Sequence, residues 1–582
     1  MLIRAIAVAT ALLAVGACNE QAPASNKKAS STTPTPQKQT AGSGTTTNPT
    51  SPMMVSTSAA VPPVMLACCT PVTTTPVTGT PAAVTPPAAV TPPAATTPPA
   101  TVTPPATVTP PAVTPPAATT PPPATAAAVA DFQYLPILGD ADGNPNDNSA
   151  TYNLTVDNNV PVTVVTPTAT WKTPMMRYNG LQLPPVIVAK RGTNISVNVQ
   201  NNLTEATTVH WHGFKIPANQ DGGPDLPIAA GAARTYAFTV SQAAAPLWFH
   251  PHADGTTATQ VYKGLAGGFV VTDDITQSLE TGKQLPSGAY DIPMLIQDRS
   301  FTTTTTAAGV RTLVYRGGMM GMLGNRVLVN GVQQPTLKVA TRQYRFKLFN
   351  GSNARNYDFA LSDSSLFTVV GTDGGLLPSP VRTDHLTLGS GERAEIVVDF
   401  RSIPLNSTIS LINRITSGGA AREVVYFNVA TQATDDVNLY TSLPSSADIN
   451  QRLSATSASK TRNFVLNTVG MMTFAINGKL FDMNRVDERV SSNATEIWAI
   501  NNTTNMAHPF HAHAIQWQVL DRSGVPSTGV DLGWKDTVLV QPGETVRIIG
   551  RFDPVINKGL YMYHCHILEH EEAGMMGTFL VQ

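Results

Sequence analysis

The stretch ISVNVQN at residues 195–201 alternates strictly between apolar and polar side chains. A period of two residues is typical of a β-strand with one buried face. The strand ends in Asn201, and similar strands recur as YRFKLFN, which ends at Asn350, and EIWAIN, which ends at Asn501. The recurrence predicts a β-structured unit that repeats at intervals of about 150 residues, the size of one domain.

Two further markers accompany each of these strands. An Asn-Gly pair, which favours a tight hairpin turn, precedes each strand and begins at Asn179, Asn330 and Asn477. A glycine turn before another alternating strand follows at Gly231, Gly391 and Gly543. Three markers in the same order, three times, predict an all-β protein of three tandem β-sandwich domains, each a Greek-key β-barrel. We place their limits at residues 131–275, 276–432 and 433–582.

The composition of the 582 residues excludes several classes of protein. The formal net charge is −1 and only 13% of the residues are charged, so the basic excess of a nucleic-acid-binding protein is missing. Four cysteines are too few for a disulfide scaffold. Since no run of about 18 apolar residues follows the N-terminus, no later membrane span is predicted. We expect a monomer.

The N-terminal segment predicts export. Residues 1–18, MLIRAIAVATALLAVGAC, combine an arginine, an apolar stretch and small residues, as a signal peptide does. Their end, Val-Gly-Ala-Cys, resembles a bacterial lipobox, which implies cleavage before Cys18 and a lipid on that cysteine; the alternative is an ordinary signal with a chance cysteine. We therefore expect a lipid-anchored protein of the bacterial cell envelope, periplasmic and held at the outer membrane, with no other membrane contact.

Residues 19–130 are a low-complexity segment rich in proline, threonine and alanine. They contain no aromatic residue, and the first one in the chain is Phe132. Such a segment cannot bury a core, so we expect a disordered, extended tether between the lipid and the folded part. Cys68 and Cys69 lie in this tether, and adjacent cysteines bridge each other poorly, so we expect incidental or intermolecular thiols.

Ten of the eleven histidines fall in four tight groups, and the isolated His385 suggests an ordinary surface or core residue. The groups are HWH at residues 210–212, HPH at 250–252, HPFHAH at 508–513, and HCH at 564–566 followed by His570. On a strand, residues i and i+2 point to the same face, so each His-x-His pair aims two imidazoles at one point. Neutral imidazole is the usual ligand for copper, zinc, iron or nickel. All four pairs lie in the first and third repeats, and the second repeat, GSNARNYDFAL after Asn350, keeps the turn without the histidines.

Cys565 is the only cysteine in the folded part, so it cannot form a disulfide there. On a strand it faces away from His564 and His566, which favours two metal sites on opposite sides of one strand. His508, Cys565 and His570 supply two imidazoles and a thiolate, and Met575 can offer a weak axial thioether. This is a blue-copper ligand set. The eight histidines of the four pairs then remain for a second, all-imidazole site that suits three metal ions.

The motifs HWHG, WFHPH, HPFHAH, GWKDTV and HCHILEHEEAGMM resemble those of the multicopper oxidase family over residues 131–582. The C-terminal third is most similar to bacterial periplasmic cuprous oxidases. The resemblance implies cupredoxin-like domains and four copper ions. It assigns the type 1 copper to His508, Cys565, His570 and axial Met575, the type 2 copper to His210 and His511, and the type 3 pair to His212, His250, His252, His513, His564 and His566.

The resemblance also implies the activity. A substrate gives single electrons to the type 1 copper, and dioxygen takes up four of them, with four protons, to form water at the trinuclear cluster. Asp221 and Glu571 match family positions for proton delivery; the alternative is a pair of surface turn carboxylates.

Methionines bear on the identity of the electron donor. Met506 precedes His508 by two residues, and Met319, Met320 and Met322 form a glycine-flanked cluster. Thioethers suit Cu(I), although most methionines serve packing. The methionine-rich insertion of the related cuprous oxidases is missing from residues 433–470, and Thr504 replaces their acidic residue.

We therefore favour a broad, laccase-like oxidase of phenolic or other organic donors with some Cu(I) activity. The alternatives are a dedicated cuprous oxidase in copper tolerance and a non-catalytic, copper-sequestering lipoprotein. A copper nitrite reductase lacks the paired-histidine set, and a zinc hydrolase leaves the His-Cys-Met set unexplained.

Overall fold

The computed structural model describes residues 130–141, 143, 148–416, 419–420, 422–445, 447–470 and 473–582. The expected signal peptide with Cys18, the tether up to residue 129, and Cys68 and Cys69 lie outside these residues. Within the described ranges, no helix is long and apolar enough to cross a membrane. Strands dominate there, which confirms the prediction of an all-β protein.

The first repeat, β1 to β8, packs two sheets face to face. One sheet contains β1, β2, β4 and β6, and the other has the strand order β3-β8-β7-β5. Trp211, Phe249 and Phe269 lie in the core of this repeat. The elements are β1 (Ser149–Val165), β2 (Thr170–Tyr178), β3 (Val186–Lys190), β4 (Asn194–Asn201), β5 (His210–His212), β6 (Ala233–Thr239), β7 (Ala245–His250), α1 (Thr257–Lys263), β8 (Gly267–Thr272) and α2 (Asp274–Thr281).

The second repeat, β9 to β20, forms another sandwich around Phe346, Ile396 and Phe427. One of its sheets has the order β12-β20-β19-β14-β17, and the other joins the first repeat through a parallel bridge between Val165 and Val332. The strands are β9 (Asp291–Arg299), β10 (Arg326–Val329), β11 (Val332–Gln333), β12 (Thr336–Ala340), β13 (Gln343–Asn350), β14 (Tyr357–Leu361), β15 (Phe367–Thr372), β16 (Gly375–Thr383), β17 (His385–Leu388), β18 (Arg393–Asp399), β19 (Thr408–Asn413) and β20 (Glu423–Thr431). His385 is exposed on β17.

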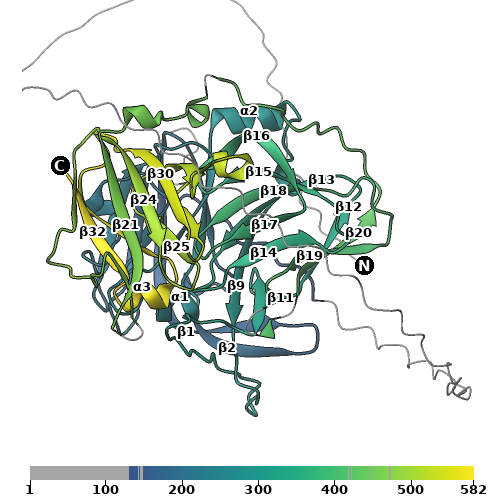
Figure 1. Ribbon diagram of the computed structural model, residues 1–582. Coiled ribbons are helices and arrows are strands. Elements are labelled where there is room, and N and C mark those ends of the chain that lie inside the picture. Colours follow the sequence, from purple (N-terminus) through teal and green to yellow (C-terminus); the bar gives the residue numbers. More distant parts are fainter. Residues whose placement is uncertain are drawn as a thin grey trace, which may run out of the picture. The chain divides into compact units, whose positions relative to one another are not determined.

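The third repeat, β21 to β32, has sheets of order β22-β21-β24-β30-β26-β27 and β23-β32-β31-β25-β29, and β21, β24 and β30 run side by side in Figure 1. Phe464, Trp498 and Cys565 lie in its core. The elements are β21 (Lys460–Val469), β22 (Thr473–Ile476), β23 (Glu488–Val490), β24 (Thr495–Asn502), β25 (His508–Ala512), β26 (Trp517–Arg522), β27 (Val525–Pro526), β28 (Trp534–Lys535), β29 (Thr537–Val540), β30 (Thr545–Arg551), β31 (Gly559–Cys565), α3 (Leu568–Glu572) and β32 (Met576–Val581). Short 3₁₀ helices lie at Ala218–Gln220, Gly288–Tyr290, Asp448–Asn450, Ala455–Ser457 and Gly529–Leu532.

A buried asparagine closes the same corner in each repeat. β4, β13 and β24 end at Asn201, Asn350 and Asn502. Each side-chain amide donates to a carbonyl four or five residues further on, over 2.7–2.9 Å. The glycine of the following turn donates back to each asparagine carbonyl. The expectation that Asn501 marks the third corner is wrong by one residue, since Asn501 is exposed and the doubled asparagine hides the register in the sequence.

The predicted hairpin turns also recur with the same geometry. Asn179, Asn330 and Asn477 have φ angles between 49° and 54°, and the glycine after each also has a positive φ. Each asparagine Oδ1 accepts a hydrogen bond from a backbone N–H, over 2.6–2.8 Å. Left-handed backbone is accessible mainly to glycine and asparagine, which explains the pair at each turn.

The corner asparagine gives the histidine pairs a common position. In the first and third repeats a His-x-His pair begins nine residues after the corner. In the middle repeat the corner turn is one residue longer, so Ala360 and Ser362 occupy these positions. Phe359 and Leu361 pack in the core of the middle repeat, as Phe510 and Ala512 do in the third. The middle repeat therefore keeps the scaffold and has an alanine and a serine in place of the two imidazoles.

We predict that Asn350→Ala destabilises the protein by about 2–4 kcal/mol, because the buried carbonyls of Arg355 and Leu388 each lose a donor. Urea unfolding of the metal-free protein measures the change. Asn198 lies exposed on β4, and Asn198→Ala, the matched control, should change the free energy of unfolding by no more than about 0.5 kcal/mol. Equal losses in the two variants would contradict this role of the corner.

Candidate metal centre

Each histidine pair lies on a short strand or at its end: β5 contains both His210 and His212, whereas the second histidine of the other pairs lies one or two residues past the end of β7, β25 or β31. β5 pairs antiparallel with β7, which puts His210 opposite His250. β25 pairs antiparallel with β31, which puts His511 opposite His564. Because side chains alternate along a strand, Cys565 and His564 leave β31 on opposite faces.

The eight histidines of the four pairs are all buried and form one cluster. Their ring nitrogens make three sets, in each of which the atoms lie within 4.8 Å of one another: His210, His212 and His511; His212, His250 and His566; and His252, His513 and His564. The structure thus brings together, from the first and third repeats, the histidines that the sequence singled out.

Each ring turns one nitrogen to an oxygen and the other to the cluster. Seven rings use Nδ1 for the oxygen. The partners are the Asp221 carbonyl for His210 (2.9 Å), the Asp536 carbonyl for His511 (2.8 Å), the Pro251 carbonyl for His250 (2.8 Å), the Cys565 carbonyl for His564 (3.0 Å), the Asp221 carboxylate for His513 (2.6 Å), the Ser390 hydroxyl for His566 (3.3 Å) and the Glu571 carboxylate for His252 (3.4 Å). His212 instead uses Nε2, which lies 2.9 Å from the Asp536 carboxylate.

The inward-facing nitrogens fit a set of metal ions. Three of them have no hydrogen-bond partner among the described residues: Nε2 of His210, His511 and His566. Nε2 of His252 and of His513 lie 3.2 and 3.3 Å from Nε2 of His564, although each of these three rings holds its other nitrogen against an oxygen. Lone pairs so close repel unless a cation lies between them, and imidazole nitrogen is a preferred ligand of copper.

Burial keeps these imidazoles neutral. It lowers the pKa of His250 and of His511 to about 3, and that of His564 to about 4. A neutral imidazole presents a lone pair to a metal, whereas an imidazolium does not. At neutral pH the cluster is therefore in the protonation state that a metal requires.

A second set lies on the other face of β31. The Sγ of Cys565 is 3.4 Å from Nδ1 of His508 and 3.6 Å from Nδ1 of His570. On the far side of the rings, Nε2 of His508 lies 2.8 Å from the Thr504 hydroxyl. Nε2 of His570 donates to the carbonyl of Met319 over 2.7 Å. Two imidazoles and one sulfur can hold a soft metal ion such as copper.

Met575 lies beside this second set. Its backbone N–H donates to the carbonyl of His570 over 2.8 Å, and its carbonyl accepts from Cys565 over 3.1 Å. Its side chain packs in the same core as Cys565. Met506 is only partly buried against that core, and Met320 is 59% exposed.

Two buried carboxylates border the imidazole cluster. Oδ2 of Asp221 is 2.6 Å from Nδ1 of His513, and the Glu571 oxygens lie 3.4 and 3.3 Å from Nδ1 of His252 and of His564. Burial raises the pKa of both carboxyls well above the usual range, and the neighbouring acids add to it. Both are buried, so the interpretation as exposed turn residues is wrong.

Sequence reasoning missed Asp536 and its partners. The GWKDTV motif contains Asp536, but its contact with Arg393 joins residues 143 positions apart. Burial alone raises the pKa of Asp536, but Arg393, through charge and hydrogen bonds, lowers it to about 2. The one available signal in the sequence was that Asp536 lies in the GWKDTV motif and had no assigned role.

The glycine of HWHG is explained by this ion pair. Gly213 has a φ of 88°, and a Cβ atom there would lie 2.6 Å from Oδ2 of Asp536 and 2.7 Å from Nη2 of Arg393. We predict that Gly213→Ala destabilises the protein by more than the about 1–2 kcal/mol of left-handed strain.

Gly231→Ala is the matched control, because Gly231 has a φ of 75° and no atom within 4 Å of a Cβ. Thermal unfolding of the metal-free variants measures both changes. If the two alanines cost the same free energy, the close packing of the ion pair against residue 213 does not hold.

Three sequence models of the multicopper oxidase family match residues 159–275, 294–420 and 445–582. The chain is 34% identical over 411 residues to the multicopper oxidase mco of Staphylococcus epidermidis, covering 69% of this chain and 83% of that protein. It is 31% identical over 462 residues to a laccase of Bacillus subtilis, covering 69% of this chain and 88% of the relative. The crystal structure of McoA multicopper oxidase from Aquifex aeolicus matches with a TM-score of 0.69 and 33% identity, over 78% of this chain and 99% of that one. Together with the cluster of buried histidines, these similarities show that the chain belongs to the multicopper oxidase family and is a copper-dependent oxidoreductase with dioxygen as electron acceptor.

Proposed function

We propose that the protein holds four copper ions and couples single-electron oxidation of a phenolic or other organic donor, or of Cu(I), to the reduction of dioxygen to water. The observation that carries this proposal is the convergence of eight buried, neutral imidazoles on one side of β31 with a two-histidine thiol set on the other. Copper bound in these two places would supply the one-electron oxidation of the donor and the four-electron reduction of dioxygen.

The resemblance to the family supplies the division into ligand sets, and the nitrogens and the sulfur that face each centre fit it. His508, Cys565 and His570, with Met575 as axial ligand, would hold the type 1 copper. His210 and His511, whose Nε2 atoms have no hydrogen-bond partner in the part of the chain that the structure describes, would hold the type 2 copper. The type 3 pair would lie among the remaining six: His212, His250, His252, His513, His564 and His566.

Cys565 links the two centres. The residues on either side of it in the chain, His564 and His566, belong to the imidazole cluster, and their ring centroids are 5.7 Å apart. A few covalent bonds of one strand therefore join the thiol set to the cluster. This linkage is what a storage protein without turnover does not need, so it favours catalysis over copper sequestration.

Asp221 and Glu571 would hold protons for the reduction of dioxygen. Each has a buried oxygen without a hydrogen-bond partner among the described residues, Oδ1 of Asp221 and Oε2 of Glu571. Burial raises their pKa and so favours the protonated carboxyl, which lets each keep a proton next to the cluster imidazoles.

The donor would bind in a cavity of about 370 Å³ beside His570. Tyr315, Met319 and Phe474 are among its lining residues. The Phe474 ring lies 4.5 Å from the ring of His570, between centroids. A cavity of this size and aromatic lining fits a phenol, whereas the Met319 thioether suits Cu(I).

The proposal also includes an exported, monomeric protein that a lipid on Cys18 and a tether hold at the outer membrane. It includes three domains with limits at 131–275, 276–432 and 433–582. The signal-like N-terminus, the low-complexity segment and the repeated strand markers support these parts.

We predict that the copper-loaded protein is blue and that Cys565→Ser loses the visible colour and oxygen uptake while keeping copper in the imidazole cluster. Thiolate-to-copper charge transfer causes the colour, and serine cannot provide it. Absorption spectra, copper content and oxygen consumption measure the three effects. Cys68→Ser, which changes a thiol outside the described residues, is the control and should behave as the unmodified protein. A colourless loaded protein would contradict the type 1 assignment, and a blue protein without oxygen uptake for any donor would favour sequestration.

Met319→Leu separates the two donor classes, because leucine keeps the volume and removes the thioether. We predict an approximately tenfold higher KM for Cu(I), as loss of about 1.4 kcal/mol of binding implies, and an unchanged KM for a phenol. Oxygen uptake with each donor in parallel gives both constants. An unchanged KM for Cu(I) would show that the sulfur takes no part in binding, and equal rises for both donors would show a damaged cavity instead.

A further inference from the structure

Two aspartates occupy equivalent positions around the imidazole cluster. The carbonyl of Asp221 accepts from Nδ1 of His210 over 2.9 Å, and that of Asp536 accepts from Nδ1 of His511 over 2.8 Å. Each carboxylate then crosses to a histidine of the other repeat, Asp221 to His513 and Asp536 to His212.

The stacked rings follow the same relation. His210 lies on His513 and His212 lies on His511, with a centroid distance of 3.9 Å in both pairs. The first and third repeats therefore meet across an approximate twofold relation, and Asp536 is the counterpart of Asp221.

The first and third repeats differ in the orientation of one ring, His212. His513 offers Nδ1 to Asp221 and keeps Nε2 for the cluster, whereas His212 offers Nε2 to Asp536 and keeps Nδ1 for the cluster. Nδ1 of His212 lies 3.4 Å from Nε2 of His250, inside one of the three nitrogen sets. His212 is the one ring of the eight that faces the cluster with this nitrogen.

Asp536, which contacts His212, has different neighbours from Asp221, which contacts His513. Arg393 on β18 forms two hydrogen bonds of 2.6 Å to Asp536, one to each oxygen. Gln516 adds a third, from Nε2 to Oδ2 over 2.9 Å. A carboxylate held by a bidentate arginine can only accept, so the nitrogen of His212 that meets it must donate. None of the ion pairs among the described residues joins Asp221 to a lysine or arginine.

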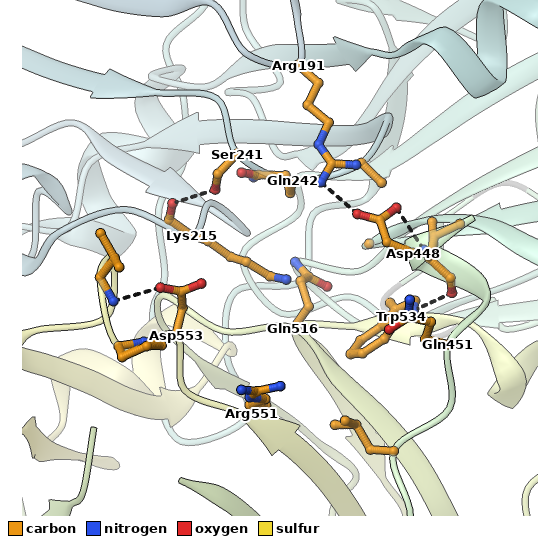
Figure 2. A pocket seen from close by; sticks show the side chains of 16 residues that line it. Arg191, Lys215, Ser241, Gln242, Asp448, Gln451, Gln516, Trp534, Arg551 and Asp553 are labelled. Atoms are coloured by element: carbon orange, nitrogen blue, oxygen red, sulfur yellow. Dashed lines mark hydrogen bonds and ion pairs between the residues drawn. The ribbon is translucent and has the colours of Figure 1, made fainter. Parts of the chain in front are cut away.

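Gln516, which contacts Asp536, also lines a cavity of about 510 Å³ (Figure 2). The Lys215 side chain extends toward Gln516 in this view. The amide nitrogen of Gln516 also donates to the carbonyl of Gly213 over 2.9 Å, so two acceptors orient this amide. Gln516 thus forms a wall between the cavity and Asp536.

We propose that Asp536, clamped by Arg393 of the middle repeat and by Gln516, is a positioning residue that fixes the His212 ring with Nδ1 toward the metal cluster. This inference rests on the proposed function of the cluster. The middle repeat, which carries no histidine of the cluster, then determines ligand geometry through Arg393.

Asp373 provides the matched control, because it belongs to the same buried charge group and touches no histidine of the cluster. Its Oδ1 accepts from the backbone N–H of Arg393 over 2.7 Å, and its Oδ2 lies 3.0 Å from Nζ of Lys535. Asp373→Asn and Asp536→Asn therefore remove the same charge from neighbouring sites, and only the second changes a partner of His212.

The experiment loads each full-length variant with copper and titrates it with a copper chelator. Copper content after each chelator step follows the loss of cluster copper, electron paramagnetic resonance reports the type 2 ion, and the visible absorption of the Cys565 site serves as an internal reference. We expect Asp536→Asn to lose cluster copper with an affinity lowered about 10–100-fold, as removal of a ligand-orienting partner does, and to show an altered resonance spectrum. Asp373→Asn should lower the unfolding temperature while its cluster affinity and spectrum stay unchanged.

A cluster affinity and spectrum of Asp536→Asn equal to those of the unmodified protein would overturn the inference, and so would an equal copper loss in Asp373→Asn. If Asp536→Asn does not fold, Gln516→Met keeps the ion pair and removes one donor; a smaller loss in the same direction supports the inference, and no change overturns it. Failure of the unmodified protein to bind cluster copper would instead overturn the proposed function.

Discussion

Antiparallel pairing of β25 with β31, in the register that sets His511 opposite His564, determines which side chains face which centre. Side chains alternate along β31, so the sulfur of Cys565 joins His508 and His570 while its neighbours point into the imidazole cluster. A shift of one residue would exchange these faces and bring sulfur into the cluster. The corner asparagine at the end of β24 and the pairing of β25 with β29 hold that register from either end.

The middle repeat contributes to the site without a histidine of the cluster. Its Ser390 contacts His566, its Arg393 holds Asp536, and its Met319 carbonyl orients His570. Ala360 and Ser362 stand at the positions that hold imidazoles in the other repeats, so β14 offers no imidazole there. The middle repeat thus orients ligands of its neighbours and supplies no imidazole to the cluster itself.

Local spacing predicted the parts of the site that depend on one strand, and it failed where contacts join distant segments. The His-x-His and His-Cys-His patterns indicate the faces of β5 and β31 because the strand period is two residues. The same reasoning missed Asp536 and Arg393, because their bond depends on how two repeats pack. It also placed the third corner at Asn501 instead of Asn502. Only burial distinguishes these two residues, and two identical neighbours do not reveal in the sequence which of them is buried.

The central claim is that the eight imidazoles and the thiol set bind copper in one buried centre shared by the first and third repeats. A crystal of the copper-loaded protein, measured on both sides of the copper absorption edge, tests this claim most directly. We expect anomalous peaks within bonding distance of Nε2 of His210 and His511, between Nε2 of His252, His513 and His564, and at the sulfur of Cys565. Peaks only at Cys565, or at none of these atoms in a fully loaded crystal, would contradict it.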